Sequence, residues 1–266
     1  MKTMILKDVK TFCEMQKRCF SSDIEKMQTP PRLAIVQVGN NEASNRYVRN
    51  KIKDCNEVGI FAERYWYPED ITEIEMKCEI KYLSQFCDGL IVQLPLPPHI
   101  RYNVITFGLL PLQDVDGFLL GSPHKAATPK GIMDYLKYCE FDLTGKHVVI
   151  IGRSEIVGKP LAKLMTDANA TVSLCHSYSK LEPLLEIADL VVCAVGQPHF
   201  LDCSKLNCPV IDVGINFDEN GKLVGDCYNT EGKDVTPVPG GVGLLTRCAL
   251  LDNVIKAAKG GQGLCQ

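Results

Sequence analysis

The sequence predicts an α/β protein made of two domains. Three observations support this prediction. The chain has 266 residues with 45% hydrophobic content, which is enough for two cores. Short apolar runs alternate with helical patterns along most of its length. A glycine-containing turn at 152–158 joins a continuous apolar run to a helical one. Because strands separated by helices form parallel β-α-β units, we expect a parallel sheet in each domain.

Composition and charge exclude several classes of protein. A net charge of -3 leaves no basic field, so neither nucleic acid nor a membrane surface is an expected partner. The 13 cysteines are odd in number and include no Cys-x-x-Cys pair, which favours reduced thiols. Charged residues interrupt the first twenty positions, and no apolar run could span a bilayer, so we expect a cytoplasmic protein.

The first half of the chain should form an amphipathic helix and then a β-α-β series. The helix is expected over residues 5–27, before Thr29-Pro30-Pro31. Strands are expected at 33–38, 61–67 and 89–93, with helices at 43–53 and 72–86 between them. In such sheets ligands bind beyond the carboxyl ends of the strands. Residues that directly follow these strands are therefore candidates for a site.

Tyr47 and Lys51 are the first such candidates. They lie four residues apart in the helix after the first strand, so they share one face. An amine desolvated beside a phenol can exchange protons near neutral pH. By itself this spacing is more often a solvated helix face.

Gln93 and a turn with two acids complete the candidates of the first half. Gln93 ends the third strand and is followed by a proline-rich segment that would fix its direction, although a plain strand-end polar residue remains the alternative. The turn at 111–117 carries Asp114 and Asp116. It could cap a helix, accept hydrogen bonds from a ligand or, least favoured, bind a metal.

The second half begins with a helix from Pro129 to about 139 and a buried strand at 148–151. This strand is followed by a turn from Gly152 to Gly158, and a helix begins at the end of the turn. In this arrangement a pyrophosphate can bind to the backbone amides at the start of the helix. The match to Gly-x-Gly-x-x-Gly is imperfect, because Ser154 stands at the second glycine and the last glycine comes one residue late.

The strand at 171–174 indicates which dinucleotide is bound. It ends in Cys175-His176-Ser177, where NAD-binding proteins usually carry an acid, and Arg153 lies in the glycine turn. A cationic side chain together with hydroxyl groups favours binding of a 2′-phosphate, so we expect NADP to be preferred over NAD. A capping or loop role for His176 is the alternative.

The remaining elements continue the alternation. We expect a helix at 181–188, strands at 190–194 and 210–213, a turn at 218–221, a loop at 236–243, a last helix at 244–259 and a loose tail from Gly260.

Together, these segments resemble bifunctional methylenetetrahydrofolate dehydrogenase/cyclohydrolase from about residue 30 to residue 258. The set is specific because seven unrelated motifs occur in the family's order. They are Ala43-Ser44-x-x-Tyr47-Val48-x-x-Lys51, Val92-Gln93-Leu94-Pro95-Leu96-Pro97, Asp114-Val115-Asp116-Gly117, Gly152-Arg153-Ser154-x-x-Val157-Gly158, Asn169-Ala170-Thr171-Val172, Cys175-His176-Ser177 and Pro237-Val238-Pro239-Gly240-Gly241-Val242-Gly243.

The resemblance implies a folate-binding catalytic domain at 1–120 plus 247–266 and a Rossmann-like NAD(P)-binding domain at 121–246. The two would flank a cleft, with the C-terminal helix returning to the first. The implied reactions are oxidation of 5,10-methylenetetrahydrofolate with NADP+, NAD being less favoured, and hydrolysis of the methenyl product to 10-formyltetrahydrofolate. The resemblance also implies a role in one-carbon metabolism and purine biosynthesis, a homodimer and no metal.

Residue roles follow from the same resemblance. Lys51 matches the catalytic lysine, Tyr47 the tyrosine that stacks on the folate, Gln93 the amide that tunes the lysine and Asp116 the acid that holds the pterin. Further substrate-binding positions are Val92, Leu94, Pro95, Pro239, Gly240 and Gly241. The cofactor-binding positions are Gly152, Arg153, Ser154, Ile156, Val157, His176, Ser177, Ala194, Val195, Gly196 and Ile215.

Three segments depart from the family's pattern. Ala126-Ala127 replaces Pro-Cys, the stretch after Gly117 is shorter, and Leu244-Leu245 replaces Pro-Met. These changes leave a second reading open, a folate- or nucleotide-binding homologue that has lost one or both activities. A short-chain dehydrogenase also uses Tyr-x-x-x-Lys, but there the pair follows the glycine turn, whereas here it precedes it.

Overall fold

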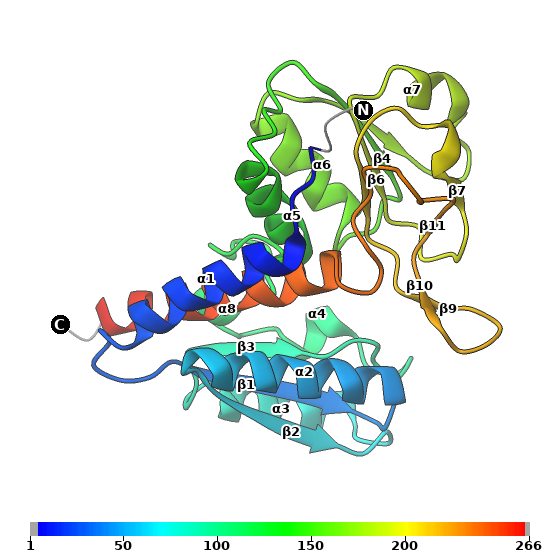
Figure 1. Cartoon of the computed structure of the whole chain (residues 1–266). Coiled ribbons are helices and arrows are strands. Elements are labelled where there is room, and N and C mark those ends of the chain that lie inside the picture. Colours follow the sequence, from blue (N-terminus) through cyan, green and yellow to red (C-terminus); the bar gives the residue numbers. More distant parts are fainter. Residues whose placement is uncertain (1–4, 264–266) are drawn as a thin grey trace. The chain divides into compact units, whose positions relative to one another are not determined.

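A computed structural model describes residues 5–263, and the chain divides into two compact units (Figure 1). Unit 1 comprises Met1–Glu14 and Thr128–Ala249, and unit 2 comprises Met15–Ala127 and Leu250–Gln266. The expected domains, 1–120 with 247–266 and 121–246, differ from this division chiefly at the N-terminus. There the residues up to Glu14 group with unit 1.

Contacts within unit 1 explain this assignment. The Asp234 carboxylate accepts hydrogen bonds from the backbone N–H groups of Ile5 (2.7 Å) and Leu6 (3.1 Å). The Tyr135 hydroxyl donates to the Lys7 carbonyl. These bonds hold the start of the chain outside a helix, so α1 (Val9–Ile24) begins later than the expected residue 5. Its first turn is capped by a bond from Thr11 N–H to the Asp8 carboxylate.

Unit 2 contains a three-stranded parallel sheet in the order β2-β1-β3. The strands are β1 (Arg32–Val38), β2 (Phe61–Tyr67) and β3 (Gly89–Val92). Helix α2 (Glu42–Val58) connects β1 to β2, α3 (Glu73–Leu83) connects β2 to β3, and the short α4 (Tyr102–Ile105) follows. Asn41 caps α2 and Gly59 ends it in a left-handed conformation, while Thr72 and Glu75 form a capping box on α3.

Unit 1 contains a four-stranded parallel sheet in the order β5-β4-β6-β8. Its strands are β4 (His147–Ile151), β5 (Thr171–Cys175), β6 (Leu190–Cys193) and β8 (Val210–Asp212). The connecting helices are α6 (Gly158–Asp167) and α7 (Glu182–Glu186), and α5 (Ala127–Tyr138) precedes the sheet. The chain moves from β4 to one side and from β6 to the other, so the switch point of this sheet lies between β4 and β6.

Smaller elements complete unit 1. Strands β7 (Leu201–Asp202) and β11 (Cys227–Tyr228) pair in parallel, and β9 (Asn216–Phe217) pairs with β10 (Leu223–Val224) as a hairpin around the expected turn. Two single-turn 3-10 helices lie at Pro111–Gln113 in unit 2 and at Cys203–Lys205 in unit 1.

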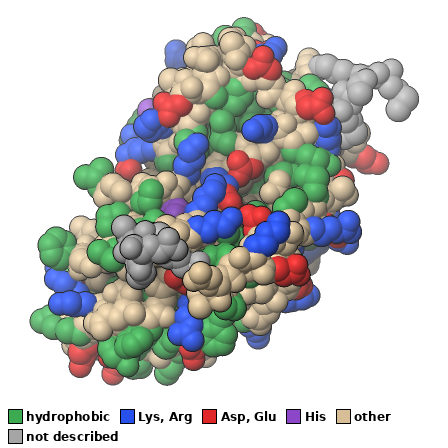
Figure 2. All heavy atoms as spheres, turned by 90° about the vertical axis from the view of Figure 1, so that its left-hand side faces the viewer, with side chains coloured by type: hydrophobic (Ala, Val, Ile, Leu, Met, Phe, Trp, Pro, Cys, Tyr) green, Lys and Arg blue, Asp and Glu red, His purple; other side chains and the backbone are tan. Residues whose placement is uncertain are grey.

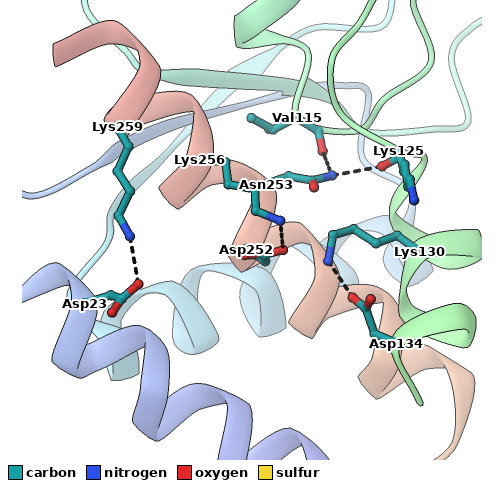
Figure 3. A network of polar contacts seen from close by, with 9 residues as sticks. All are labelled: Asp23, Val115, Lys125, Lys130, Asp134, Asp252, Asn253, Lys256 and Lys259. Carbon is teal, nitrogen blue, oxygen red and sulfur yellow. Dashed lines mark hydrogen bonds and ion pairs between the residues drawn. The ribbon is translucent and has the colours of Figure 1, made fainter. Parts of the chain in front are cut away.

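The last helix, α8 (Val242–Gly263), is longer than expected. Residues 260–263 are helical, so the prediction of a loose tail from Gly260 was wrong there, and residues 264–266 lie outside the described part. Gly260 packs against Leu112, because an added Cβ would lie 3.2 Å from the Leu112 methyl groups. In unit 2 the ends of α1 and α8 are joined by the Lys259–Asp23 ion pair at 2.7 Å (Figure 3).

The surface carries charges of both signs. Figure 2 shows Lys and Arg interspersed with Asp and Glu over the visible face, in keeping with the small net charge of -3. Among residues 5–263, no helix has the length and apolarity needed to cross a lipid bilayer.

Candidate active site

Lys51 and Gln93 meet at the carboxyl edge of the sheet in unit 2. The Lys51 ammonium donates to Gln93 Oε1 at 3.1 Å, and Gln93 Nε2 donates to the Leu94 carbonyl at 2.8 Å. The amide is therefore fixed with its oxygen toward the lysine. The Ser44 hydroxyl also donates to the Leu94 carbonyl (3.3 Å), which ties the first turn of α2 to the segment after β3. The side chain of Lys51 is half-buried.

Two acids of the turn after the 3-10 helix have different environments. The Asp114 carboxylate accepts from the backbone N–H groups of Gly117 (3.2 Å) and Leu119 (2.8 Å), so it shapes the turn. Asp116 is buried, and no hydrogen bond to its carboxylate is found within residues 5–263. Burial raises the pKa of Asp116 to about 6, while the charge of Lys51 opposes this shift and that of Asp114 adds to it. Asp116 is thus the acid with acceptor capacity left for a ligand.

The other predicted residues of unit 2 lie near this edge with different exposure. Tyr47 is half-buried one helical turn before Lys51, Leu94 is half-buried and Pro95 is exposed after a cis peptide bond. Val92 is 1% exposed and packs in the core, so only its backbone could contact a substrate. Within the described residues, no cluster of three or more His, Cys, Asp or Glu side chains is placed to hold a metal.

In unit 1 the predicted cofactor residues follow three adjacent strands. The Gly152 N–H donates to the Cys175 carbonyl (3.0 Å), and the Ala194 N–H donates to the Ile151 carbonyl (2.8 Å). Arg153, His176 and Ala194 therefore all follow the same edge of the sheet. Gly152 has φ 113°, and an added Cβ would lie 2.1 Å from the Ala194 carbonyl oxygen, so only glycine fits at this switch point.

The glycine turn contacts the start of α6 closely. A Cβ on Gly158 would lie 2.0 Å from the Gly152 carbonyl oxygen. The Ser154 hydroxyl accepts from the N–H groups of Val157 (3.2 Å) and Gly158 (3.4 Å), so two of the amides expected to face a pyrophosphate already have a partner. Arg153 is exposed and forms no ion pair with any carboxylate of residues 5–263, which leaves its guanidinium available to an anion. The neighbouring Ile156 is exposed as well.

His176 shapes its own turn. Its Nδ1 accepts from the Tyr178 N–H (3.2 Å), and its backbone N–H donates to the Ser179 hydroxyl (3.0 Å). This agrees with the loop role considered above, and it places the proton of a neutral ring on Nε2. Ser177 beside it is exposed.

The glycine loop before α8 exposes part of its motif. Pro239, Gly240 and, further back, Ile215 are exposed. Gly241 is buried, and an added Cβ would lie 2.4 Å from the Pro237 carbonyl oxygen. Leu245, one of the departures from the family's pattern, is fully buried, with its backbone against Gly131.

The sequence reasoning missed three buried polar residues. Asp212 and Asp226 in unit 1 and Asn253 in unit 2 are each at most 3% exposed and bind backbone groups. A signal was available for each. Gly214 lies two residues after Asp212, Gly225 lies directly before Asp226, and Asn253 interrupts an apolar helix face.

The fold and these two edges define a two-unit α/β enzyme in which one unit has the topology of a dinucleotide-binding domain. The model of the NAD(P)-binding domain of tetrahydrofolate dehydrogenase/cyclohydrolase matches residues 126–262, and that of the catalytic domain matches residues 4–116. The chain therefore belongs to the tetrahydrofolate dehydrogenase/cyclohydrolase family, which confirms the predicted family and fold class.

Individual relatives agree. The bifunctional protein FolD of Brevibacillus brevis is 43% identical over 255 residues, which cover 89% of this chain and 90% of that protein. The crystal structure of the bifunctional enzyme FolD from Campylobacter jejuni has a TM-score of 0.91 and 38% identity, covering 96% of this chain and 98% of that one. The crystal structure of the FolD of Trypanosoma brucei, complexed with NADP cofactor and inhibitor, has a TM-score of 0.90 and 28% identity. It covers 98% of this chain and 99% of that one.

Proposed function

We propose that this chain oxidises 5,10-methylenetetrahydrofolate to the 5,10-methenyl compound with NADP+ and hydrolyses that product to 10-formyltetrahydrofolate. Family membership supports both activities, since the relatives are named as bifunctional dehydrogenase/cyclohydrolases. The NAD(P)-binding family model and the NADP complex of the Trypanosoma brucei relative support the cofactor. In this proposal unit 2 binds the folate and unit 1 binds NADP.

The contact between Lys51 and Gln93, with Asp116 nearby, is the observation that carries the proposal. In the first reaction the bridging carbon loses a hydride to NADP+ and becomes part of a cationic methenyl bridge. In the second reaction water adds to this carbon and loses one proton to a base. The bond from the carbon to N5 then breaks as the hydroxyl becomes a carbonyl, N5 takes the hydroxyl proton, and a formyl group stays on N10. We assign the proton transfer to Lys51, and Gln93 holds its amine in place.

The remaining roles in unit 2 follow from charge and exposure. Asp116 has an open carboxylate, which suits the N–H donors of a pterin ring. Tyr47, half-buried beside the lysine, offers an aromatic face for stacking. Leu94, Pro95 and the backbone of Val92 would line the same edge.

The cofactor roles in unit 1 rest on the edge formed by β4, β5 and β6. The close approach of Gly152 to Ala194 brings the ends of β4 and β6 together at the switch point of the sheet, where ligands of such folds bind. We assign the 2′-phosphate of NADP to Arg153, supported by Ser154, His176 and Ser177. Because Ser154 already binds the amides of Val157 and Gly158 at the start of α6, the side chain of Arg153 is the principal anion-binding group in this proposal.

The test is a turnover assay with matched variants. Purified protein with methylenetetrahydrofolate and NADP+ should form the absorbing methenyl product and then consume it. Lys51→Met should abolish hydrolysis and leave NADPH affinity nearly unchanged. Lys53→Met is the control, because Lys53 lies on the same helix, is exposed, and forms a long ion pair of 3.8 Å with Glu57.

Two results would contradict this assignment. Binding of folate and NADPH without any methenyl product would favour the second reading, a homologue that has lost its activities. Full hydrolysis by Lys51→Met would remove Lys51 from the mechanism.

The proposal includes a cytoplasmic homodimer. All twelve cysteines of residues 5–263 are free, which suits a reducing compartment. Strand β5 lies at one edge of the sheet of unit 1, and an edge strand offers unpaired backbone groups to a second copy. Light scattering should give twice the chain mass of 29.5 kDa, and cell fractionation tests the location.

A further inference from the structure

Asp226 of unit 1 binds three consecutive backbone amides of the loop that follows β6. Its Oδ2 accepts from the N–H groups of Val195 (2.6 Å) and Gly196 (2.9 Å), and its Oδ1 accepts from that of Gln197 (2.9 Å). The side-chain amide of Asn216 donates to Oδ1 as well, at 2.8 Å. Asp226 is fully buried, so these four donors satisfy its carboxylate.

A second buried acid holds Asp226 itself. Asp212 Oδ1 accepts from the N–H groups of Asp226 and Gly214, both at 3.0 Å, and its Oδ2 accepts from that of Cys227 at 3.0 Å. The end of β8 thus fixes the backbone that carries Asp226.

Glycines make room for both acids. A Cβ on Gly214 would lie 2.2 Å from Asp226 Oδ1, and one on Gly225 would lie 1.9 Å from Asp212 Oδ2. Side chains at these positions would displace the carboxylates. The two carboxylates therefore form one tightly fitted assembly, in which Asp212 supports Asp226 and Asp226 supports the loop.

The loop held by Asp226 lies at the switch point of the sheet. Its first residue, Ala194, is in direct contact with Gly152, the glycine of the predicted cofactor turn. Successive backbone N–H groups that converge in this way form a concave nest for an anion. Here an internal carboxylate fills the nest, so the three amides point into the protein and the opposite side of the loop is left to face a ligand.

We propose that Asp226 is a positioning residue for the dinucleotide. It fixes the loop from Ala194 to Gln197 in the conformation that receives NADP, and it does not touch the cofactor. This inference rests on the proposed function, which assigns cofactor contacts to Ala194, Val195 and Gly196. Without the carboxylate, the three amides lose their common acceptor and the loop changes conformation.

The test uses the full chain and NADPH fluorescence titration. In Asp226→Asn an NH2 group replaces one carboxylate oxygen and faces N–H donors, so we expect NADPH affinity to fall about tenfold or more. Hydrolysis of methenyltetrahydrofolate consumes no NADP+ and should stay near the wild-type rate. Asp202→Asn is the matched control, because Asp202 binds Ser204 N–H and Asn229 elsewhere in unit 1 and should leave NADPH affinity unchanged.

A milder variant covers the case in which Asp226→Asn does not fold. Asn216→Ala removes one donor to Asp226 and keeps the carboxylate, and it should weaken NADPH binding about threefold. Wild-type NADPH affinity in a folded Asp226→Asn, or in Asn216→Ala if the former does not fold, would overturn the inference. Wild-type protein that binds no NADPH would instead overturn the proposed function on which it rests.

Discussion

The side-chain amide of Asn253 in α8 donates to the backbone carbonyl of Val115 at 2.9 Å, directly before Asp116 (Figure 3). The same amide nitrogen donates to the Lys125 carbonyl at 3.0 Å. The carbonyls of Val115 and Lys125 lie on either side of the stretch after Gly117 that is shorter than in the family. One buried side chain, that of Asn253, therefore binds both sides of this stretch. A third bond, from Ala127 N–H to the Asp116 carbonyl (3.3 Å), closes the segment.

Removing this clamp should loosen the segment that carries Asp116. We expect Asn253→Ala to lower the free energy of unfolding by ~1–3 kcal/mol, because the buried Val115 carbonyl and the partly buried Lys125 carbonyl lose their donor. The KM for the folate substrate should rise while NADPH affinity stays unchanged. Urea denaturation and steady-state kinetics measure both effects.

The control for this variant is Lys256→Ala on the same helix. Lys256 is exposed and pairs with Asp252 at 2.8 Å, a contact of little energetic consequence. Equal effects of the two substitutions on the folate KM would show that the clamp does not position Asp116.

The raised pKa of Asp116 predicts a pH dependence of substrate use. Binding of pterin N–H groups requires the carboxylate form, and burial raises the pKa of Asp116 to about 6. The kcat/KM for the folate should therefore fall as pH drops below 6. Asp116→Asn should have low kcat/KM at every pH and lack this inflection. A wild-type profile that is flat between pH 5 and 7 would contradict the assignment.

The same group predicts a pH dependence of stability. In the folded protein the carboxyl group of Asp116 keeps its proton up to about pH 6, whereas in the unfolded chain it loses the proton near its ordinary pKa of 3.8. Stability should thus fall as pH rises through this window, by at most ~3 kcal/mol. Urea denaturation at pH 4.5 and pH 8 should show a smaller difference for Asp116→Asn than for the wild type.

Arg153 should decide between the two dinucleotides. Its exposed guanidinium has no acidic partner within residues 5–263, so its charge is available to a 2′-phosphate. We expect Arg153→Ala to raise the KM for NADP+ about tenfold or more and to change that for NAD+ little. Lys159→Ala removes a nearby exposed cation already bound to Glu155 and is the control. Equal losses for NADP+ and NAD+ would contradict the prediction.

Two glycines test the unexpected helical end of α8. Gly261 has open space, since an added Cβ would meet only Asp88 at 4.0 Å. Gly261→Ala should therefore stabilise the protein by ~0.5–1 kcal/mol. Gly260→Ala should gain less or lose stability, because its Cβ would press on Leu112 at 3.2 Å. Thermal unfolding compares the pair, and no gain from Gly261→Ala would indicate a frayed end.

The sequence was sufficient where local spacing determines the structure. The alternation of strands and helices predicted both parallel sheets. The position of Gln93 after β3 and of Lys51 in α2 predicted that they share an edge, because parallel strands end on one side. The residue pattern alone left the roles of Asp114 and Asp116 open, and only the family resemblance singled out Asp116. The folded turn shows the physical difference, because the Asp114 carboxylate binds backbone amides.

Contacts between distant segments could not be predicted. The packing of Ile5 and Leu6 depends on Asp234, more than 200 residues away, and nothing near the N-terminus indicates it. Asp226 likewise acquires its partners only when β6, β8 and β11 are assembled. The tail was predicted to be loose because it is a chain terminus. Its close packing at Gly260 against Leu112, far away in the sequence, is a long-range contact that the local sequence does not indicate.

Helix α8 is shared by the two units. Its residues up to Ala249 belong to unit 1, and those from Leu250 onward belong to unit 2. A fragment that stops before α8 would lack Val254, Ile255 and Ala258, all buried apolar residues of unit 2. Neither unit is one continuous stretch of polypeptide. Cutting the gene into two halves should therefore yield insoluble pieces, and a separately folding folate-binding unit would require residues 250–263 to be joined by a linker to residue 15.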